Sequence, residues 1–212
     1  NSEGTSWGDT VSFETKIPLT NLNIQEAVDA WCADSVVAEV SYGHISDWVV
    51  SHVTSMFTLF KDKSDFNSDI GNWDVSSVDD MKGMFKGASS FNQDIGLWDV
   101  SSVTAMSNMF EGAVSFDQDL NDWDVSSVVL MDFMFLNCEN FNQDLNDWDV
   151  SSVVSTMGMF QGSTAFNGQI SNWNTGAVTR MSSMFNNCEN FNQDLNDWDV
   201  SSVINFQLMF GD

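Results

Sequence analysis

The chain has 212 residues, of which 42% are hydrophobic, and its formal net charge is −25. This apolar content is enough for a folded core. Only 6 basic residues stand against 31 acidic ones, which argues against nucleic acid or an anionic membrane surface as a partner. Basic proteins, cations and neutral glycans are compatible with this charge. No apolar run approaches the roughly 20 residues needed to cross a bilayer.

Residues 1–47 lack the regular pattern of the rest of the chain, and we interpret them as an N-terminal segment with a helical cap. Within this segment, Asn23-Ile-Gln-Glu26 resembles a capping box. We expect an amphipathic helix here that covers the exposed core of the first repeat, as end caps do in repeat proteins. Its apolar residues are Leu22, Ile24, Ala27, Val28 and Trp31.

A 25-residue period begins at residue 48 and continues to the end of the chain. A fixed period with the same residue types in the same positions predicts a stack of units that bury one another's apolar side. Residues 48–212 are therefore predicted to be a repeat solenoid of seven coils. The period is marked by Trp48, Trp73, Trp98, Trp123, Trp148, Trp173 and Trp198.

Each unit divides into two parts with different apolar spacing. Residues 95–100 follow the L-x-x-L-x-L pattern of leucine-rich repeats, which predicts one short parallel strand per coil. Between Val78 and Phe85 the apolar residues recur every three or four positions, which predicts a short helix or 3₁₀ turn. The expected fold class is an α/β solenoid, a leucine-rich-repeat-like right-handed stack with ladders of Trp, Phe and Met in its core.

Two positions of the unit accept only a few residue types. Gly and Asn alternate at one of them, which predicts a left-handed backbone. Cys138 and Cys188 share the other position with Ala and Ser, which predicts a small buried site. Because two coils separate these cysteines, about 10 Å at strand spacing, they are too far apart for a disulfide and should be free thiols. The Gly/Asn position holds Gly87, Gly112, Asn137, Gly162 and Asn187.

The chain stops at Asp212, inside the last repeat and without a second predicted cap. An uncovered apolar end would be unfavourable in water. We therefore expect the chain to be a fragment of a longer protein, or its C-terminal end to be buried by a partner subunit in an oligomer.

The residues of the unit resemble those of a known family. Trp-Asp-Val-Ser-Ser-Val, Met-x-x-Met-Phe and Phe-Asn-Gln-Asp at 25-residue spacing are similar to the BspA-like surface-protein repeat, which residues 81–94 match almost throughout. The resemblance covers residues 20–212. It implies a leucine-rich-repeat-related protein of the mycoplasma and lactobacillus surface lipoprotein type, with a role in adhesion and no catalytic residues.

The candidate binding surface is a set of acidic residues that flank the tryptophans and are predicted to face outward. Four of them would share one patch, for which Ca²⁺ is a suitable cation. The alternative is that each Asp accepts hydrogen bonds from the Ser residues after it in an Asx-type turn. The absence of an Asp-x-Asp-x-Asp-Gly loop favours this alternative. The full set is Asp74, Asp99, Asp122, Asp124, Asp147, Asp149, Asp197 and Asp199, and the four are Asp122, Asp124, Asp147 and Asp149.

A second acidic row follows the Asn-Gln pair of each unit and is interrupted at Gln169. Its side chains are predicted to satisfy backbone groups in the turns between coils. The row consists of Asp69, Asp94, Asp119, Asp144 and Asp194.

No enzymatic activity is expected from this sequence. Its two histidines, His44 and His52, form no zinc-binding pattern with cysteine, and there is no nucleophile elbow or phosphate loop. The leading interpretation is an extracellular or cell-surface recognition module that presents its acidic surface to protein, glycan or matrix. The alternatives are a structural spacer within a larger surface protein, or a Ca²⁺-dependent binding module.

Overall fold

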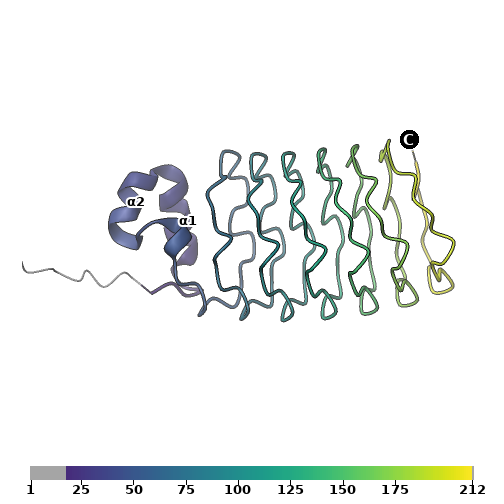
Figure 1. Ribbon diagram of the computed structural model, residues 1–212, viewed down its shortest axis with the longest axis horizontal. Coiled ribbons are helices and arrows are strands. Elements are labelled where there is room, and N and C mark those ends of the chain that lie inside the picture. The colour runs from purple at the N-terminus through teal and green to yellow at the C-terminus, as the bar shows by residue number, and fades with distance from the viewer. Residues whose placement is uncertain (1–17, 212) are drawn as a thin grey trace, which may run out of the picture.

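The computed structural model describes residues 18–211, which form a helical pair followed by a regular stack of coils (Figure 1). The pair consists of α1 (Ile24–Ala33) and α2 (Ser35–Tyr42), and the short 3₁₀ helix η1 (Ile45–Asp47) leads into the first coil. Residues 1–17 of the predicted N-terminal segment lie outside the described part. Each coil returns after 25 residues, because Ser55 is bridged to Asp80, Asp80 to Ala105, and so on to Asn205.

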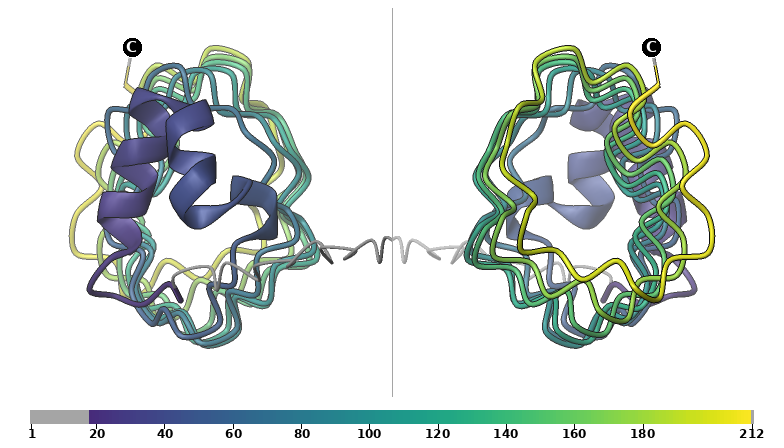
Figure 2. Two further views of the ribbon diagram at one scale, coloured as in Figure 1. Left: turned by 90° about the vertical axis from the view of Figure 1, so that its left-hand side faces the viewer. Right: turned by 90° about the vertical axis from the view of Figure 1, so that its right-hand side faces the viewer.

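The predicted amphipathic helix is confirmed as α1, which lies over the end of the stack (Figure 2). Its buried residues are Ile24, Ala27, Val28 and Trp31. The prediction was wrong for Leu22, which precedes the helix and is 96% exposed. The capping box was also wrong: Asn23 makes no side-chain cap to the helix, because its Oδ1 accepts a hydrogen bond from the Thr20 N–H at 2.8 Å.

The predicted α/β, leucine-rich-repeat-like stack with one short parallel strand per coil is wrong. Within residues 18–211 the only β pairings are isolated parallel bridges, and no strand forms. In the segment expected to be a strand, the Trp98 N–H closes a turn onto Ile95 O, and the Ser101 N–H donates to its neighbour Asp99. Because these donors are used locally, the segment cannot extend a hydrogen-bonded sheet from coil to coil.

Most of the backbone hydrogen bonds between coils lie instead in the segment where a helix or 3₁₀ turn was expected. Alternate N–H groups donate to the next coil, as from Phe85 to Met109 O at 2.8 Å. The N–H groups between them close turns within their own coil, as from Lys86 to Gly83 O. This alternation produces neither a helix nor a strand. The N–H groups of this coil that donate onward belong to Met81, Gly83, Phe85 and Gly87.

A left-handed backbone at two positions of this segment makes the alternation feasible. The Gly/Asn position is confirmed as left-handed, with φ of 71° at Gly87 and 58° at Asn137. A second left-handed position lies four residues earlier, where Gly83 is replaced by Phe133 in another coil, with φ of 58°. Left-handed Phe is unfavourable on its own, so the contacts of the stack must offset its cost.

The core is a set of side-chain ladders that run along the stack, as predicted. Within a coil, the rings of Phe85 and Phe91 stack with centroids 4.0 Å apart, and Phe85 also stacks on Phe110 of the next coil at 5.6 Å. Each repeat tryptophan reaches back to the preceding coil: the indole N–H of Trp148 donates to Leu120 O at 2.7 Å. These side-chain contacts bind successive coils in addition to the backbone hydrogen bonds.

The position shared by Ala, Ser and Cys lies in the core behind the ladders. Its complete burial explains why only these small residues occur there. Ala113, Cys138 and Ser163 are fully buried there. Cys138 Sγ donates to Phe110 O at 2.8 Å, and Ser163 Oγ donates to the matching carbonyl of Phe135. Burial raises the pKa of the Cys138 thiol. The prediction of free thiols is confirmed for Cys138 and Cys188.

Candidate functional site

The acidic residues directly after the repeat tryptophans form one exposed row, which we call the first acidic row. Each carboxylate accepts a hydrogen bond from the N–H of the Ser two residues later, as from Ser76 to Asp74 at 3.2 Å. The Ser76 hydroxyl donates to the same oxygen at 2.6 Å. The predicted Asx-type turns are therefore confirmed. The row consists of Asp74, Asp99, Asp124, Asp149 and Asp199, with Asn174 between the last two.

At Asp74 and Asp99 these hydrogen bonds favour the ionised form of the carboxylate. The Ser76 hydroxyl, followed by the Ser76 N–H, lowers the pKa of Asp74, and Ser101 lowers the pKa of Asp99 in the same way. Asp74 in the neighbouring coil opposes the shift at Asp99, since like charges raise a carboxyl pKa. The charges of Asp74 and Asp99 therefore interact between neighbouring coils.

The acidic residues before the tryptophans are also exposed, as predicted, but they make different contacts. Asp147 Oδ2 accepts a hydrogen bond from Asn121 Nδ2 at 2.6 Å, and its N–H donates to Asn121 Oδ1. Asp122 and Asp197 are exposed and accept no hydrogen bond from residues 18–211. Only one of the three therefore links two coils.

The predicted four-carboxylate Ca²⁺ patch is not assembled. Nowhere in the described residues do three or more His, Cys, Asp or Glu side chains form a group that could hold a metal ion. Three of the four carboxylates make other contacts: Asp124 and Asp149 accept from Ser126 and Ser151 in their own turns, and Asp147 accepts from Asn121 of the neighbouring coil.

The second acidic row has the predicted role in turns. Asp94 Oδ1 accepts from the Gly96 N–H at 3.0 Å, and Asp119 accepts from Asn121. Asp144 Oδ1 instead accepts a hydrogen bond from the Gln169 N–H of the next coil at 2.7 Å. These carboxylates stabilise the backbone of the turns.

A polar row that links the coils was missed by the sequence analysis. Asn92 Oδ1 accepts from the Asp117 N–H at 2.9 Å and from Gln118 Nε2 at 2.8 Å, both in the next coil. Asn67 and Asn167 make the same pair of contacts to the coils that follow them. The recurrent Phe-Asn-Gln-Asp was the available signal. An amide that recurs at the same position of each coil lies next to its counterpart in the adjacent coil and can form hydrogen bonds with it.

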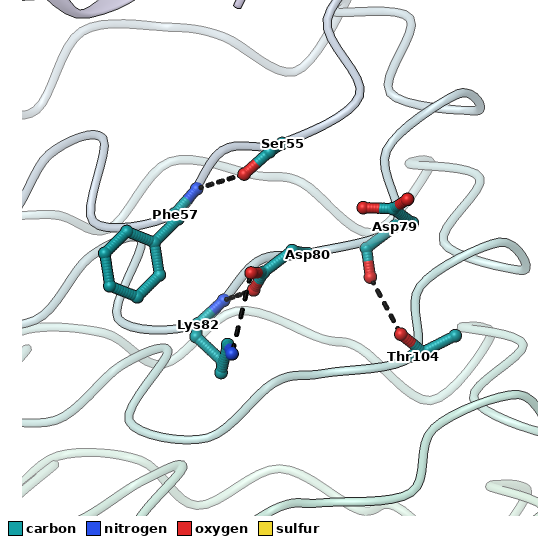
Figure 3. Close-up of polar contacts among 6 residues, drawn as sticks. All are labelled: Ser55, Phe57, Asp79, Asp80, Lys82 and Thr104. Carbon is teal, nitrogen blue, oxygen red and sulfur yellow. Dashed lines mark hydrogen bonds and ion pairs between the residues drawn. The ribbon is translucent and has the colours of Figure 1, made fainter.

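The bridged edge of the first coils carries a small charged cluster that is not repeated along the stack (Figure 3). Lys82 Nζ lies 3.6 Å from Asp80 Oδ2 and 5.8 Å from the ring centroid of Phe57. The position of Asp80 is held by Ala105 and Leu130 in the next two coils. The cluster therefore stabilises this edge locally and offers no extended surface.

A polar cleft of about 450 Å³ lies between α1 and the first coil. Lys63 Nζ is paired with Asp29 Oδ1 at 2.7 Å across it, and Trp31 Nε1 donates to Ser68 Oγ. Burial raises the pKa of the Cys32 thiol, which also lines the cleft. A raised pKa disfavours the thiolate, so this cysteine has no feature of an activated nucleophile.

Comparison with known proteins gave one family match. The family model described as "Mycoplasma protein of unknown function, DUF285" matches residues 30–146 and 130–212. No curated protein and no solved structure gave a match. Among the helices of residues 18–211, none is both long and apolar enough to cross a membrane.

Proposed function

This chain belongs to the DUF285 family of Mycoplasma proteins, and we propose that it is a non-enzymatic recognition module of the cell surface that binds a basic protein partner. The BspA-like resemblance of its repeat and the mycoplasma origin of its family support the surface location. The single observation that carries the proposal is the first acidic row, in which the same hydrogen-bonded carboxylate recurs on the outside of successive coils.

The row suits a cationic partner because its charges are fixed before binding. Each carboxylate is held by backbone and side-chain donors, so little side-chain freedom is lost when a partner binds. The interval between the charges is set by the coils, whose Trp148 and Trp173 rings lie 6.3 Å apart. Repeated Arg or Lys residues of a partner would meet one carboxylate after another, and the net charge of −25 would accelerate their encounter.

Protein is favoured over neutral glycan because the acidity contributes nothing to binding an uncharged sugar. A spacer without ligand would need acidity only for solubility. That need does not explain why the carboxylates of the row are held in one geometry by Ser residues in five coils. The ordered row is better explained as a contact surface.

The proposal is tested by measuring binding of the full chain to panels of basic surface proteins and of glycans, followed by Asp124→Asn plus Asp149→Asn. Asn keeps the turn, because Asn174 occupies the same position and accepts from the Gly176 N–H at 3.3 Å. We expect binding to a basic protein to weaken with little change in thermal stability. The matched control is Asp94→Asn plus Asp119→Asn in the second acidic row, which removes the same charge elsewhere.

Equal weakening by both double variants would show that only the net charge matters, and unchanged binding would remove the first acidic row from the interface. Binding to glycans alone would reject the basic protein partner. No binding in either panel would favour the structural spacer.

A further inference from the structure

The side of the stack that contains the parallel bridges carries an exposed apolar strip. We call this side the bridged edge and define it as residues 54–62 of the first coil and the matching residues of the coils that follow. The strip lies on the fourth and fifth coils, residues 123–147 and 148–172, which have a neighbour on both sides. Its exposure therefore does not come from an end of the stack. The apolar strip consists of Val129, which is 41% exposed, and of the partly exposed Leu130, Phe133, Leu136, Val154 and Met157.

Stacking of the coils does not require apolar residues at these positions. The bridged row that contains Leu130 holds Asp80 and Arg180 in other coils. The row that contains Leu136 holds Glu111 in the coil before it. Since the repeat accepts charged side chains at the same places, a group of apolar ones on two adjacent coils indicates a contact surface.

The backbone of Phe133 supports this interpretation. Phe133 has a left-handed backbone with φ of 58°, at a position where other coils have Gly83 and Gly158. Its ring lies over Gly158, where an added Cβ would collide with it. An unfavourable backbone of this kind is typical of functional sites, and here it holds an aromatic ring in the middle of the strip.

Charges of opposite sign lie on the two sides of the strip. Along the bridged row, Asp80 lies two coils before Leu130, and Arg180 lies two coils after it. Arg180 is exposed and has no ion pair within residues 18–211. The carboxylate of Asp79, beside Asp80, is exposed and also has no partner in that range (Figure 3). The charged cluster around Lys82 offers no extended surface by itself, but it marks the acidic end of this longer arrangement.

The bridged edge also has little net charge, although the chain as a whole has −25. Four of the 6 basic residues of the chain lie on it. Two such edges can therefore approach each other with less repulsion than other sides of the stack. Among the described residues of the edge, the basic ones are Lys61, Lys82, Lys86 and Arg180, and the acidic ones are Asp62, Asp79, Asp80, Glu111 and Asp132.

A second copy of the chain matches this pattern when the two stacks lie antiparallel. A two-fold axis that crosses the edge at the fourth coil places Leu130 against Leu130 of the other copy, and Asp80 against Arg180. Ala105 and Ser155, both small, then face each other between them. Because bridged neighbours are about 4.8 Å apart, the matched row is about 19 Å long. The stack runs straight over these coils (Figure 1), so the match holds along the whole row.

Asp132 lies on the fourth coil and would come close to its own counterpart at the axis. Its carboxylate accepts hydrogen bonds from Ser155 Oγ and from the Met157 N–H of the fifth coil. It is partly buried and held along the stack, so the two carboxylates need not meet.

We propose that the chain forms an antiparallel two-fold dimer through the bridged edge. The apolar strips of the two copies meet at the centre, and Arg180 of each copy pairs with Asp79 and Asp80 of the other at both ends. Side chains make this contact, because N–H groups of the edge already donate to the next coil or close local turns, as at Met131 and Met134. The inference does not depend on the first acidic row, which lies outside the bridged edge.

The test is sedimentation velocity of the full chain over a range of concentrations, in which we expect a reversible monomer–dimer equilibrium. Leu130→Glu should raise the dissociation constant about tenfold or more, since it places two like charges at the axis. The stack accepts this charge, because Asp80 and Arg180 occupy the same row. The matched control is Leu97→Glu, the same substitution at a residue that is 93% exposed outside the edge. It should leave the dissociation constant unchanged.

An exchange of the end charges tests the antiparallel pairing. Arg180→Asp should weaken the dimer of that variant, and so should Asp79→Arg combined with Asp80→Asn. Asn keeps the turn in this row, because Asn205 accepts from the Gln207 N–H at 2.9 Å. A mixture of the two variants should form a mixed dimer with nearly the affinity of the unmodified chain, since each Arg again faces a carboxylate.

A chain that stays monomeric at all concentrations would overturn the proposal. So would a dimer that Leu130→Glu leaves intact, that Leu97→Glu weakens equally, or that only Leu208→Glu in the last coil dissociates. If the mixed dimer does not form although both variants unfold at the Tm of the unmodified chain, the antiparallel pairing is rejected.

Discussion

The two ends of the stack present the same repeat in two situations. At the first coil, α1 buries Ile24, Ala27 and Val28 against the core, and Phe60 is fully buried. At the last coil, Phe210 occupies the same position of the repeat and is 62% exposed. The difference teaches that a coil is completed by what lies on its two sides. In the N-terminal cap, the side chains of Asn21 and Gln25 make two of the contacts that the backbone of a coil makes elsewhere.

The largest expected effect comes from truncating the same ring at both ends. Phe60→Ala should lower the free energy of unfolding by about 3 to 5 kcal/mol, since it leaves a cavity between the cap and the second coil. Phe210→Ala should change it by less than about 0.5 kcal/mol, because the ring is largely in water already. Urea denaturation of the two variants measures the difference. Similar losses would mean that the two ends are equally closed in solution.

The next effect comes from converting the covered end into an open one. Ala27 is fully buried where α1 meets the first coil, so Ala27→Glu should cost about 2 to 3 kcal/mol and detach the helix. The first coil would then become available to the exposed Phe210 side of the last coil of another molecule. We expect concentration-dependent head-to-tail association in sedimentation velocity, as for a heterologous contact that does not close. Ala33→Glu, the same substitution at an exposed position of the same helix, is the control and should not associate head to tail.

A smaller effect is expected from removing the Gln25 side chain alone, which makes one of the two contacts of the cap with the backbone of the first coil. Gln25→Ala removes the donor to Leu59 O and should lower the free energy of unfolding by about 1 kcal/mol, the net value of one hydrogen bond. Hydrogen exchange should rise in the first coil and stay unchanged in the last. An unaltered first coil would show that burial alone closes this end.

The smallest effect is the response to acid. The pKa values of Asp74, Asp99, Asp149 and Asp199 are lowered by hydrogen bonds from Ser. Their contribution to stability is therefore present above the ordinary Asp pKa of about 3.9 and is lost as the pH falls through the lower folded values. The first coil has Val49 in this position, so acid should loosen the last coil before the first. Hydrogen exchange between pH 5 and pH 2 measures the order, and a uniform response would contradict it.

Much of this fold could be predicted from the sequence, because side-chain burial leaves a periodic trace. The ladders of Trp, Phe and Met, the helix that covers the first coil and the left-handed Gly/Asn position follow from apolar spacing and from the backbone freedom of Gly and Asn. In the candidate site, the Asx turns were foreseen because Ser follows Asp at a fixed distance.

The position of the backbone hydrogen bonds could not be predicted in the same way. Inward Trp98 and Val100 make the segment look like a strand, but inward side chains do not reveal whether the N–H groups pair with a neighbour or close local turns. Phe133 at a positive φ gave no signal at all, since its left-handed backbone depends on contacts with the adjacent coils. The Asn67 and Asn92 contacts were missed because the amide role appears only when two coils are placed side by side.

The indole contacts have a mechanical consequence. The indole N–H of each repeat tryptophan donates to a carbonyl of the coil before it, as from Trp173 to Leu145 O. A force applied along the stack therefore acts on the stacked rings and on this hydrogen bond at each contact between coils, as well as on the covalent chain. Because each coil contacts only its neighbours, the coils should yield one after another. Each step would release 25 residues, about 80 to 90 Å when extended, so the molecule would lengthen in equal increments under tension and could shorten again as the coils rewind.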